Sequence, residues 1–204
     1  MITLGSRGTP ADVVPPSGSV VEGTLPVVKS DRGGAATLHA PGQLVSYPVV
    51  PIPGRDLRRF VWNLEEVLIR LLLDLEVTAE RSSGRPGLYV GELKIASVGL
   101  RCRRWVAAHG TSLNLSNDLS LFDGIVSCGE AGLRQTSVAA LTGRAPDMQA
   151  AKGVYLGQFA HVFGQTVASL EPATIAEVRR LIERIPTAGF EPVTPGSGGQ
   201  CSIP

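Results

Sequence analysis

Residues 32–47 have the sequence Arg32-Gly33-Gly34-Ala35-Ala36-Thr37-Leu38-His39-Ala40-Pro41-Gly42-Gln43-Leu44-Val45-Ser46-Tyr47. Small residues dominate the part before Leu44 and surround one arginine, one histidine and one glutamine. Because glycine has no Cβ, the backbone of such a segment can approach a ligand and offer its N–H groups as donors. An ordinary glycine-rich connection is the alternative. The segment lacks the Lys-Ser/Thr ending of a phosphate-binding loop, so it gives no support for nucleotide binding.

The regions on either side predict a loop between two strands. Residues 26–30 are a short β-branched run, and residues 43–50 form a second, apolar strand-like stretch. Residues 1–25 are dense in glycine and proline. This density predicts an irregular, exposed lead-in that contributes no element to the core.

Helical periodicity dominates four later segments. Apolar residues recur at spacings of three and four over residues 55–78, which predicts the strongest helix of the chain. Further helices are predicted over residues 137–143, 147–163 and 172–185. Proline and glycine crowd together beyond them, so residues 187–204 are expected to be a disordered tail after a single domain of residues 1–186.

The period changes to two over residues 87–105, which predicts a strand with Lys94, Ala96 and Val98 on one face. Gly91-Glu92 fits the tight turn of a hairpin that leads into this strand. Residues 106–115 predict another strand, interrupted at His109-Gly110. The fold class expected from these elements is α/β (α+β), with a mixed β-sheet backed by helices.

Composition excludes some classes of partner. The chain has 204 residues, with 19 Lys and Arg against 18 Asp and Glu, so a net charge of +1 provides no field that would attract nucleic acid or an anionic membrane. No stretch has the apolar length of a signal peptide or a membrane span. The cysteines Cys102, Cys128 and Cys201 are odd in number without paired spacing, which favours a reducing compartment. A cytoplasmic protein without a membrane segment is expected.

Lys94 and Cys128 are the candidate reactive residues. Lys94 lies in an apolar strand, where burial would lower its pKa so that the neutral amine could act as a base. The alternative is an edge-strand lysine that prevents aggregation. Cys128 ends an apolar run where the chain turns through Gly129. Without other information such a cysteine is usually a small core hydrophobe, and Cys102 is interpreted as packing.

His39 and His109 lie in loop-like contexts and could supply the base of a Cys-His pair. A zinc site is the weaker interpretation, because the sequence has no close C-x-x-C or H-x-x-x-H spacing. No metal is therefore expected.

Four segments together resemble the lipoyl (octanoyl) transferase family, a branch of the biotin and lipoate protein ligase fold. Residues 32–47 resemble its R-G-G-x-x-T-x-H-G-P-G-Q-L-x-x-Y run, and residues 94–99 its K-I-A-x-x-G strand. Residues 125–129 resemble its P-C-G turn, and residues 109–114 its H-G-x-x-L-N segment. Each segment alone is a weak signal, but their order and combination over residues 3 to about 145 are specific.

The resemblance implies roles for individual residues. It makes Cys128 the nucleophile that carries the acyl group as a thioester, and Lys94 the residue that activates the thiol and shuttles protons. It also implies that three segments line an acyl pocket. Their residues are Arg32, Gly33, Gly34, Ala35, Ala36, Thr37, Leu38, His39, Ser97, Val98, Gly99, Gly110, Thr111 and Ser112.

The implied activity is transfer of an octanoyl group from octanoyl-acyl carrier protein to a lysine of a lipoyl domain. The lipoyl domains implied are those of 2-oxoacid dehydrogenase complexes and the glycine-cleavage H protein. An activated thioester needs no nucleotide, so no cofactor is expected, and a monomer is expected. Two alternatives remain: a non-catalytic relative that binds acyl groups or lipoyl domains, and an ATP-dependent lipoate ligase, which would not require Cys128.

The chain departs from the family pattern at several positions. Ala40 replaces a usual glycine, which would cost about 1 kcal/mol if that position needs a positive φ. Ser127 stands where proline is usual, and Thr111 where an aromatic residue is common. Family members generally carry a further strand and helix before the segment that begins here at Thr3. We expect either that the true start lies upstream or that this element is missing.

Overall fold

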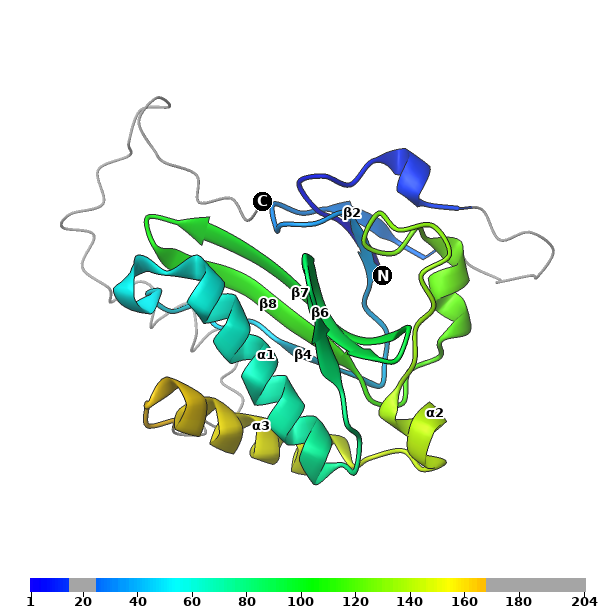
Figure 1. The fold of residues 1–204 in the computed structure, drawn as a ribbon. Helices are drawn as coiled ribbons and strands as arrows, with labels where there is room; N and C mark the ends of the chain where they lie inside the picture. Colours follow the sequence, from blue (N-terminus) through cyan, green and yellow to red (C-terminus); the bar gives the residue numbers. More distant parts are fainter. Residues whose placement is uncertain (15–24, 168–204) are drawn as a thin grey trace, which may run out of the picture.

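The computed structural model describes residues 1–14 and 25–167 (Figure 1). The helix predicted over residues 172–185, the tail predicted over residues 187–204 and Cys201 lie outside the described residues. None of the helices within the two described ranges is long and apolar enough to cross a bilayer.

A five-stranded antiparallel sheet forms the centre of the molecule, with strand order β4-β8-β7-β6-β5. Its strands are β4 (Gln43–Ser46), β5 (Glu80–Ser82), β6 (Arg85–Val90), β7 (Leu93–Arg103) and β8 (Val106–Asn114). Two long helices, α1 (Leu57–Asp74) and α3 (Met148–Phe163), pack together on one face of this sheet (Figure 1). The predicted α/β fold, with a β-sheet backed by helices, is confirmed, although every strand pair of this sheet is antiparallel.

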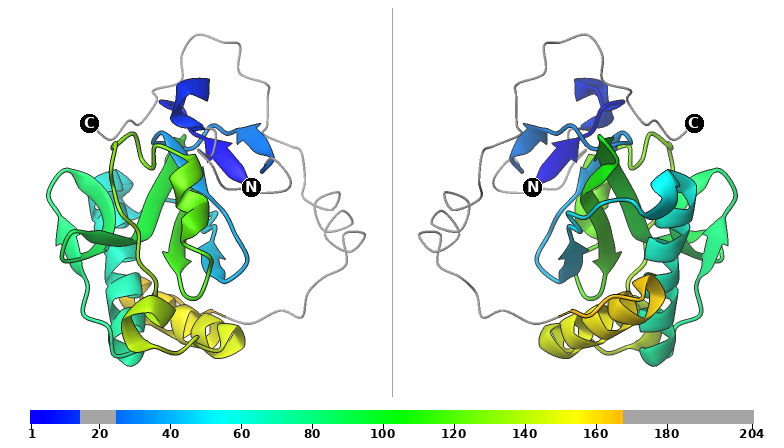
Figure 2. Two further views of the ribbon diagram at one scale, coloured as in Figure 1. Left: turned by 90° about the vertical axis from the view of Figure 1, so that its right-hand side faces the viewer. Right: turned by 90° about the vertical axis from the view of Figure 1, so that its left-hand side faces the viewer.

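A smaller three-stranded sheet has the order β2-β1-β3. It contains β1 (Ile2–Leu4), β2 (Val27–Lys29) and β3 (Ala36–Leu38), with β1 parallel to β2 and antiparallel to β3. The side views in Figure 2 place this sheet at the end of the molecule away from α3. Short helices complete the described chain: η1 (Pro10–Asp12), η2 (Pro53–Arg55), η3 (Ser120–Gly124) and α2 (Val138–Thr142).

The sequence explains where α1 begins and what it buries. Asp56 caps the helix by accepting the backbone N–H of Arg59 at 2.9 Å. Its apolar face supplies fully buried side chains such as Leu68 and Leu71, which join Ile95 of β7 in the largest core cluster. The predicted helices over 137–143 and 147–163 are likewise confirmed as α2 and α3.

The prediction that residues 1–25 contribute nothing to the core is wrong. Ile2 and Leu4 are buried and pack with Leu38 of β3 in a core cluster of their own. A three-residue strand whose side chains are all buried has no alternation that a sequence pattern could reveal. Gly5 is required by packing, because a Cβ there would lie 2.4 Å from the carbonyl oxygen of Gly34.

Two further predictions need correction. The segment of small residues is not only a loop, because β3 lies within it and pairs with β1. Strand β8 is not interrupted at His109-Gly110, since its pairing with β7 continues through Leu100↔His109 and Gly99↔Gly110. The local irregularity is confined to His109, whose φ is 57°. The pairing with β7 continues before and after His109, and it keeps the strand regular on either side of that residue.

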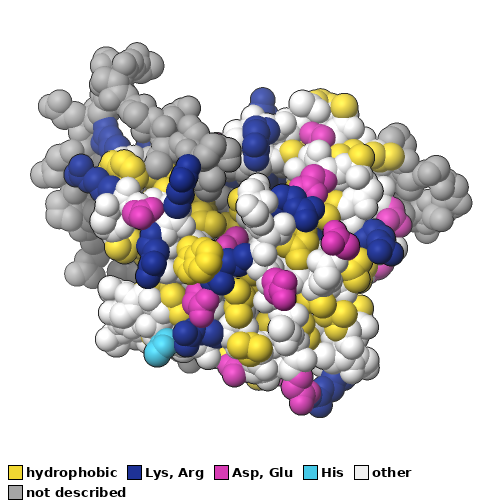
Figure 3. Space-filling view, in the orientation of Figure 1, with side chains coloured by type: hydrophobic (Ala, Val, Ile, Leu, Met, Phe, Trp, Pro, Cys, Tyr) yellow, Lys and Arg dark blue, Asp and Glu magenta, His cyan; other side chains and the backbone are white. Residues whose placement is uncertain are grey.

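Charges of both signs are interspersed over the face seen in Figure 3. This distribution agrees with the net charge of +1.

Candidate active site

Lys94 and Cys128 come together at one end of the large sheet. The Nζ atom of Lys94 lies 3.3 Å from the Sγ atom of Cys128, within hydrogen-bonding distance. Lys94 is 2% exposed at the start of β7, whereas Cys128 is half-buried in the turn that follows η3. Nζ also donates to the carbonyl oxygen of Pro86 at 3.1 Å. The amine is therefore held between a strand of the sheet and the sulfur.

The backbone of Cys128 is held in an unusual conformation. Its φ is 58°, in the left-handed region that residues other than glycine rarely adopt. Its N–H donates to the carbonyl of Ala36 at 2.9 Å, and Gly129, with a φ of 76°, completes the turn. Such conformations persist where the surroundings hold them, and they cluster at functional sites.

Ser127, the residue found in place of the usual proline, has its own partner. It is buried, and its hydroxyl accepts a hydrogen bond from Nε2 of Gln135 at 3.1 Å. Ser127 also forms a parallel bridge with Ala36 of β3. The turn that carries Cys128 is thereby joined to both β3 and the segment around Gln135.

Lys94 does not lie on a sheet edge, so the alternative of an edge-strand lysine is wrong. On one side it pairs with Tyr89 of β6. On the other its N–H donates to the carbonyl of Arg134 and its own carbonyl accepts the N–H of Thr136. These bonds on both sides fix the Cα of Lys94 and direct its side chain toward Cys128.

The pKa of Lys94 is raised, in contrast to the prediction from burial alone. Burial is the largest single influence and lowers this pKa, but the charges of Cys128 and Tyr89 together with hydrogen bonding outweigh it. Nζ lies 5.2 Å from the centroid of the Tyr89 ring. Lys94 is therefore an ammonium near neutral pH. The prediction missed Cys128 and Tyr89, which the tertiary structure brings next to the amine.

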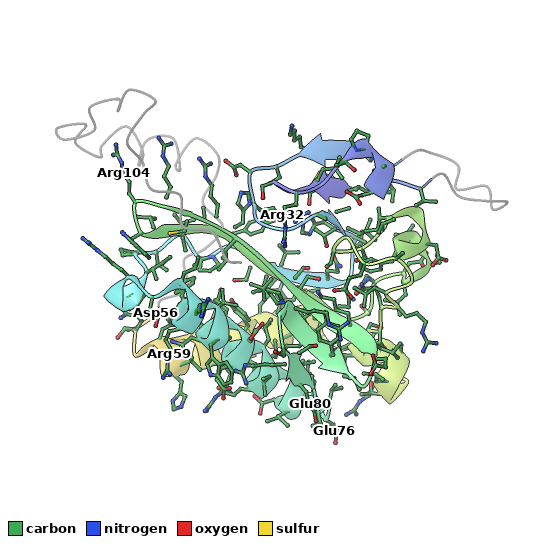
Figure 4. All side chains as sticks on the ribbon, turned by 45° about the horizontal axis from the view of Figure 1, so that its top comes forward. Arg32, Asp56, Arg59, Glu76, Glu80 and Arg104 are labelled. Atoms are coloured by element: carbon green, nitrogen blue, oxygen red, sulfur yellow. The ribbon has the colours of Figure 1, made fainter. Side chains whose placement is uncertain are left out.

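Arg32 fixes the glycine-rich segment to β1. It is buried between the two sheets, where Figure 4 labels it, and its guanidinium donates to the carbonyls of Thr3, Gly33 and Ala35 and to the hydroxyl of Thr3. Burial lowers its pKa, while the charges of Cys128 and Tyr47 oppose that shift. These hydrogen bonds place Ala35 and Ala36 beside the turn that carries Cys128.

The three segments predicted to line a pocket lie next to one another. Strands β7 and β8 pair as Ser97↔Ser112, Val98↔Thr111 and Gly99↔Gly110. The glycine-rich segment joins them through the N–H of Gly33, which donates to the carbonyl of Leu100 at 2.7 Å. At Gly99 a Cβ would come within 3.3 Å of the Arg32 side chain. Contact with an acyl chain stays a prediction for all of these residues.

Packing accounts for one glycine of this set. A Cβ at Gly110 would lie 2.2 Å from the carbonyl oxygen of Ser46 on the neighbouring strand β4, so the strand pairing itself excludes a side chain there. Thr111 is buried. Ala40 does not have a positive φ, so the strain considered for it does not arise.

The two histidines lie near Arg32. The Nε2 atom of His109 is 2.7 Å from a carboxylate oxygen of Asp31, which also pairs with Arg101. Burial lowers the pKa of His39 and of His109, and the charge of Arg32 lowers both further. The side chain that contacts Cys128 is the amine of Lys94 rather than either imidazole. Within the described residues, no three His, Cys, Asp or Glu side chains are grouped to hold a metal ion.

Tyr89 belongs to the site, and the sequence interpretation missed it. It is buried, and its charge and hydrogen bonding contribute to the raised pKa of Lys94. A signal existed in the sequence, since a two-residue turn at Gly91-Glu92 pairs Val90 with Leu93 and therefore Tyr89 with Lys94. The predicted hairpin register could have placed this ring beside the amine.

Comparison with known proteins gives a consistent result. Residues 1–160 match the model of the lipoyl protein ligase A/B catalytic domain. The octanoyltransferase of Desulfovibrio desulfuricans is 43% identical over 165 residues, which cover 79% of this chain and 70% of that protein. The octanoyltransferase of Alkaliphilus metalliredigens is 39% identical over 170 residues, which cover 82% of this chain and 78% of that protein.

Solved structures resemble the fold at low sequence identity. Lipoate-protein ligase A bound with ATP superposes with a TM-score of 0.62 at 13% identity, over 90% of this chain and 77% of that one. A putative lipoate protein ligase from T. acidophilum with bound lipoic acid has a TM-score of 0.64 at 14% identity, over 89% of this chain and 77% of that one. At these identities the likeness shows the fold.

Proposed function

Because this chain belongs to the lipoyl protein ligase A/B catalytic domain family, we propose that it carries the octanoyl group as a thioester on Cys128, with Lys94 as the residue that activates the thiol. Its octanoyltransferase relatives match most of its length, so the chain is an acyltransferase that transfers octanoyl groups in lipoate biosynthesis.

The observation that carries the proposal is the 3.3 Å contact between the amine of Lys94 and the sulfur of Cys128. An ammonium beside a cysteine favours the thiolate, which is the nucleophilic form. The raised pKa of Lys94 keeps that ammonium charged near neutral pH. The left-handed backbone of Cys128 presents the sulfur from a turn that β3 and the segment around Gln135 hold in place.

In the first half-reaction the thiolate of Cys128 attacks the thioester carbonyl of octanoyl-acyl carrier protein. A new C–S bond forms to Cys128, and the C–S bond to the carrier breaks. The departing carrier thiolate takes the proton that Lys94 holds, which leaves Lys94 as a neutral amine. The octanoyl group is now a thioester of Cys128, and no group has been oxidised or reduced.

In the second half-reaction the neutral amine of an acceptor lysine attacks the thioester of Cys128. A C–N bond forms, the C–S bond breaks, and Lys94 takes the proton that the attacking nitrogen loses. The thiolate and the ammonium are thereby restored. Both half-reactions use the same proton carrier, which accounts for a lysine placed against the sulfur.

We assign the acceptor to the lipoyl domains of 2-oxoacid dehydrogenase complexes and of the glycine-cleavage H protein. A structural relative supports this class, since it is described as an archaeal bipartite lipoate protein ligase together with its E2 lipoyl domain. The proposed chemistry needs Cys128 as a reduced thiol. A reducing compartment, hence the cytoplasm, is the corresponding location.

The test is incubation of the full chain with octanoyl-acyl carrier protein in the absence of ATP, followed by intact-protein mass spectrometry. We expect a mass gain of one octanoyl group that is abolished in Cys128→Ser and retained in Cys102→Ser and Cys201→Ser. Addition of an unmodified lipoyl domain should then move the group onto that domain.

Two outcomes would overturn the proposal. The absence of an adduct on the unsubstituted chain, with binding of the carrier retained, would indicate a non-catalytic relative. Modification of the lipoyl domain by Cys128→Ser, dependent on ATP and free octanoate, would indicate a ligase.

A further inference from the structure

Helix α1 places a carboxylate beneath the site that the mechanism above does not use. Glu65 is 6% exposed on the face of α1 that packs against the sheet. Its Oε1 atom accepts the backbone N–H of Gly87 at 2.9 Å, and its Oε2 atom lies 3.3 Å from Nε of Arg81. A buried carboxylate is costly unless it is paired and hydrogen-bonded, and Glu65 has a partner of each kind.

A single peptide group connects Glu65 with Lys94. The peptide between Pro86 and Gly87 donates its N–H to Glu65 and accepts the Nζ of Lys94 at its carbonyl oxygen, at 3.1 Å. A carboxylate at the N–H end and an ammonium at the carbonyl end polarise this peptide in the same sense. Hydrogen bonds joined in this way strengthen one another in a medium of low dielectric constant.

The absence of a side chain at Gly87 leaves room for the side chain of Lys94. Its φ is 121°, and a Cβ there would lie 2.3 Å from the carbonyl oxygen of Ala96 and 2.9 Å from Cε of Lys94. The register between β6 and β7 also shifts between Leu88 and Tyr89. Strand β6 is therefore irregular next to Gly87, whose N–H binds the Glu65 carboxylate.

Arg81 supports Glu65 from the surface. Its guanidinium stacks over the ring of Trp62 at 3.8 Å and also pairs with Glu66 at 2.8 Å. Burial raises the pKa of Glu65. This rise is opposed by the hydrogen bond from the Gly87 N–H and by the positive charges of Arg81 and Lys94, which lower the pKa. The cation and the peptide N–H thus compensate part of the cost of burying the carboxylate.

We propose that Glu65 is a positioning residue for the transfer reaction: its negative charge at the peptide N–H of Gly87 polarises that peptide, so that the carbonyl of Pro86 binds the Lys94 ammonium more strongly and holds it against Cys128. This inference rests on the proposed roles of Lys94 and Cys128. Glu65 acts through the peptide and through its negative charge, and it does not contact the sulfur.

Several charged or titratable groups face Lys94 from the elements packed around it. Cys128 lies on one side, Tyr89 comes from β6, and Glu65 comes from α1. Arg85 lies over the Tyr89 ring at 4.8 Å, and Arg32 acts on Cys128 from the glycine-rich segment. Of these, Glu65 is the group whose negative charge reaches Lys94 through a hydrogen-bonded peptide, so neutralising it alone tests the connection.

The experiment measures alkylation of the Cys128 thiolate by iodoacetamide as a function of pH, by peptide mass spectrometry on the full chain. Glu65→Gln keeps an oxygen that can accept the Gly87 N–H but loses the charge. We expect its alkylation midpoint to move to higher pH by about one unit, which near neutral pH is roughly a tenfold lower rate. Octanoyl adduct formation should slow with it.

Glu66→Gln is the matched control, because Glu66 is the neighbouring carboxylate and binds the same Arg81. Its alkylation profile should match that of the unsubstituted chain. In a Lys94→Met background, Glu65→Gln should cause no additional change, since the effect passes through the amine. A purely structural role for Glu65 predicts additive losses instead.

Arg81→Gln keeps the test decisive should Glu65→Gln fail to fold, as judged by circular dichroism. Without Arg81 the pKa of Glu65 rises further, so the carboxylate loses its charge at a higher pH. The decline of acyl transfer on the acid side should then begin at a higher pH than in Glu66→Gln.

Two results would overturn the positioning role. One is an alkylation profile of Glu65→Gln that matches that of the unsubstituted chain. The other is a decline of acyl transfer on the acid side that begins at the same pH in Arg81→Gln as in Glu66→Gln. Failure of the unsubstituted chain to form an octanoyl adduct would overturn the proposed function instead. The two failures are distinguishable because alkylation needs no acyl donor.

Discussion

The side-chain nitrogen of Lys94 and the sulfur of Cys128 lie 3.3 Å apart, although 34 positions separate the two residues in the chain. Strand β7 carries the lysine, and a left-handed turn after η3 carries the cysteine. The lysine is fixed by backbone hydrogen bonds on both sides, and the turn is bound to β3. The proposed catalytic pair therefore depends on three separate segments.

Lys94→Ala is expected to slow octanoyl adduct formation near neutral pH by about 100-fold, because it removes both the cation beside the sulfur and the proton carrier. The measurement is the rate of mass gain with octanoyl-acyl carrier protein. Lys152→Ala, on the exposed side of α3, serves as the control and should keep the unsubstituted rate. Equal rates for Lys94→Ala and Lys152→Ala would refute the catalytic role of Lys94.

Arg32→Gln is expected to lower the free energy of unfolding by roughly 2–4 kcal/mol, because it removes the charged hydrogen bonds that the buried guanidinium makes to the carbonyls of Thr3 and Ala35. Acyl transfer should also slow, since Ala36 of the same segment binds the backbone of Cys128. Urea unfolding checks the first effect. The exposed Arg103→Gln should change stability by less than about 0.5 kcal/mol, and an equally small change in Arg32→Gln would contradict the role assigned to Arg32.

Gly87→Ala is expected to cost about 2 kcal/mol or more, because the added Cβ would lie 2.3 Å from a carbonyl oxygen and the residue has a φ of 121°. The collision with Lys94 should reduce acyl transfer as well. Gly153→Ala is the matched control, since a Cβ at this helical glycine meets nothing within 4 Å. It should gain roughly 0.5–1 kcal/mol, and a similar gain in Gly87→Ala would contradict the structure at this strand.

Stability should fall in mild acid, in part through His39. Burial, and then the charge of Arg32, lower the pKa of His39 below 6.5, so the unfolded chain binds the proton more readily. This contribution to stability is complete above the unfolded pKa and is lost as pH falls through the folded one. His39→Gln should therefore lose less stability than the unsubstituted chain between about pH 7.5 and about pH 5.

Urea unfolding at the two pH values measures this difference. His161→Gln, at an exposed position of α3, is the control and should show the pH dependence of the unsubstituted chain. His109 shares the downward shift, so some acid sensitivity should remain in His39→Gln. An unaltered pH dependence in His39→Gln would be inconsistent with a half-buried imidazole whose pKa is lowered.

Local patterns in the sequence were sufficient to predict the long helices and the hairpin around Gly91-Glu92. A period of three to four buries one face of α1, and a two-residue turn sets the pairing of β6 with β7. The sequence pattern also indicated the family through four short segments. These signals depend on neighbours within a few residues, and the fold preserves such relationships.

Tertiary structure alone decided the roles of β1, Arg32 and Lys94. Strand β1 is too short to show a period, and Arg32 finds its hydrogen-bond partners in Thr3, far away in the chain. Burial by itself would have lowered the pKa of Lys94, but the sulfur and the tyrosine ring that the fold brings close reverse the shift. How deeply a side chain is buried, and which charges surround it, depend on residues that meet only in the folded chain. A local pattern of residues therefore cannot predict either.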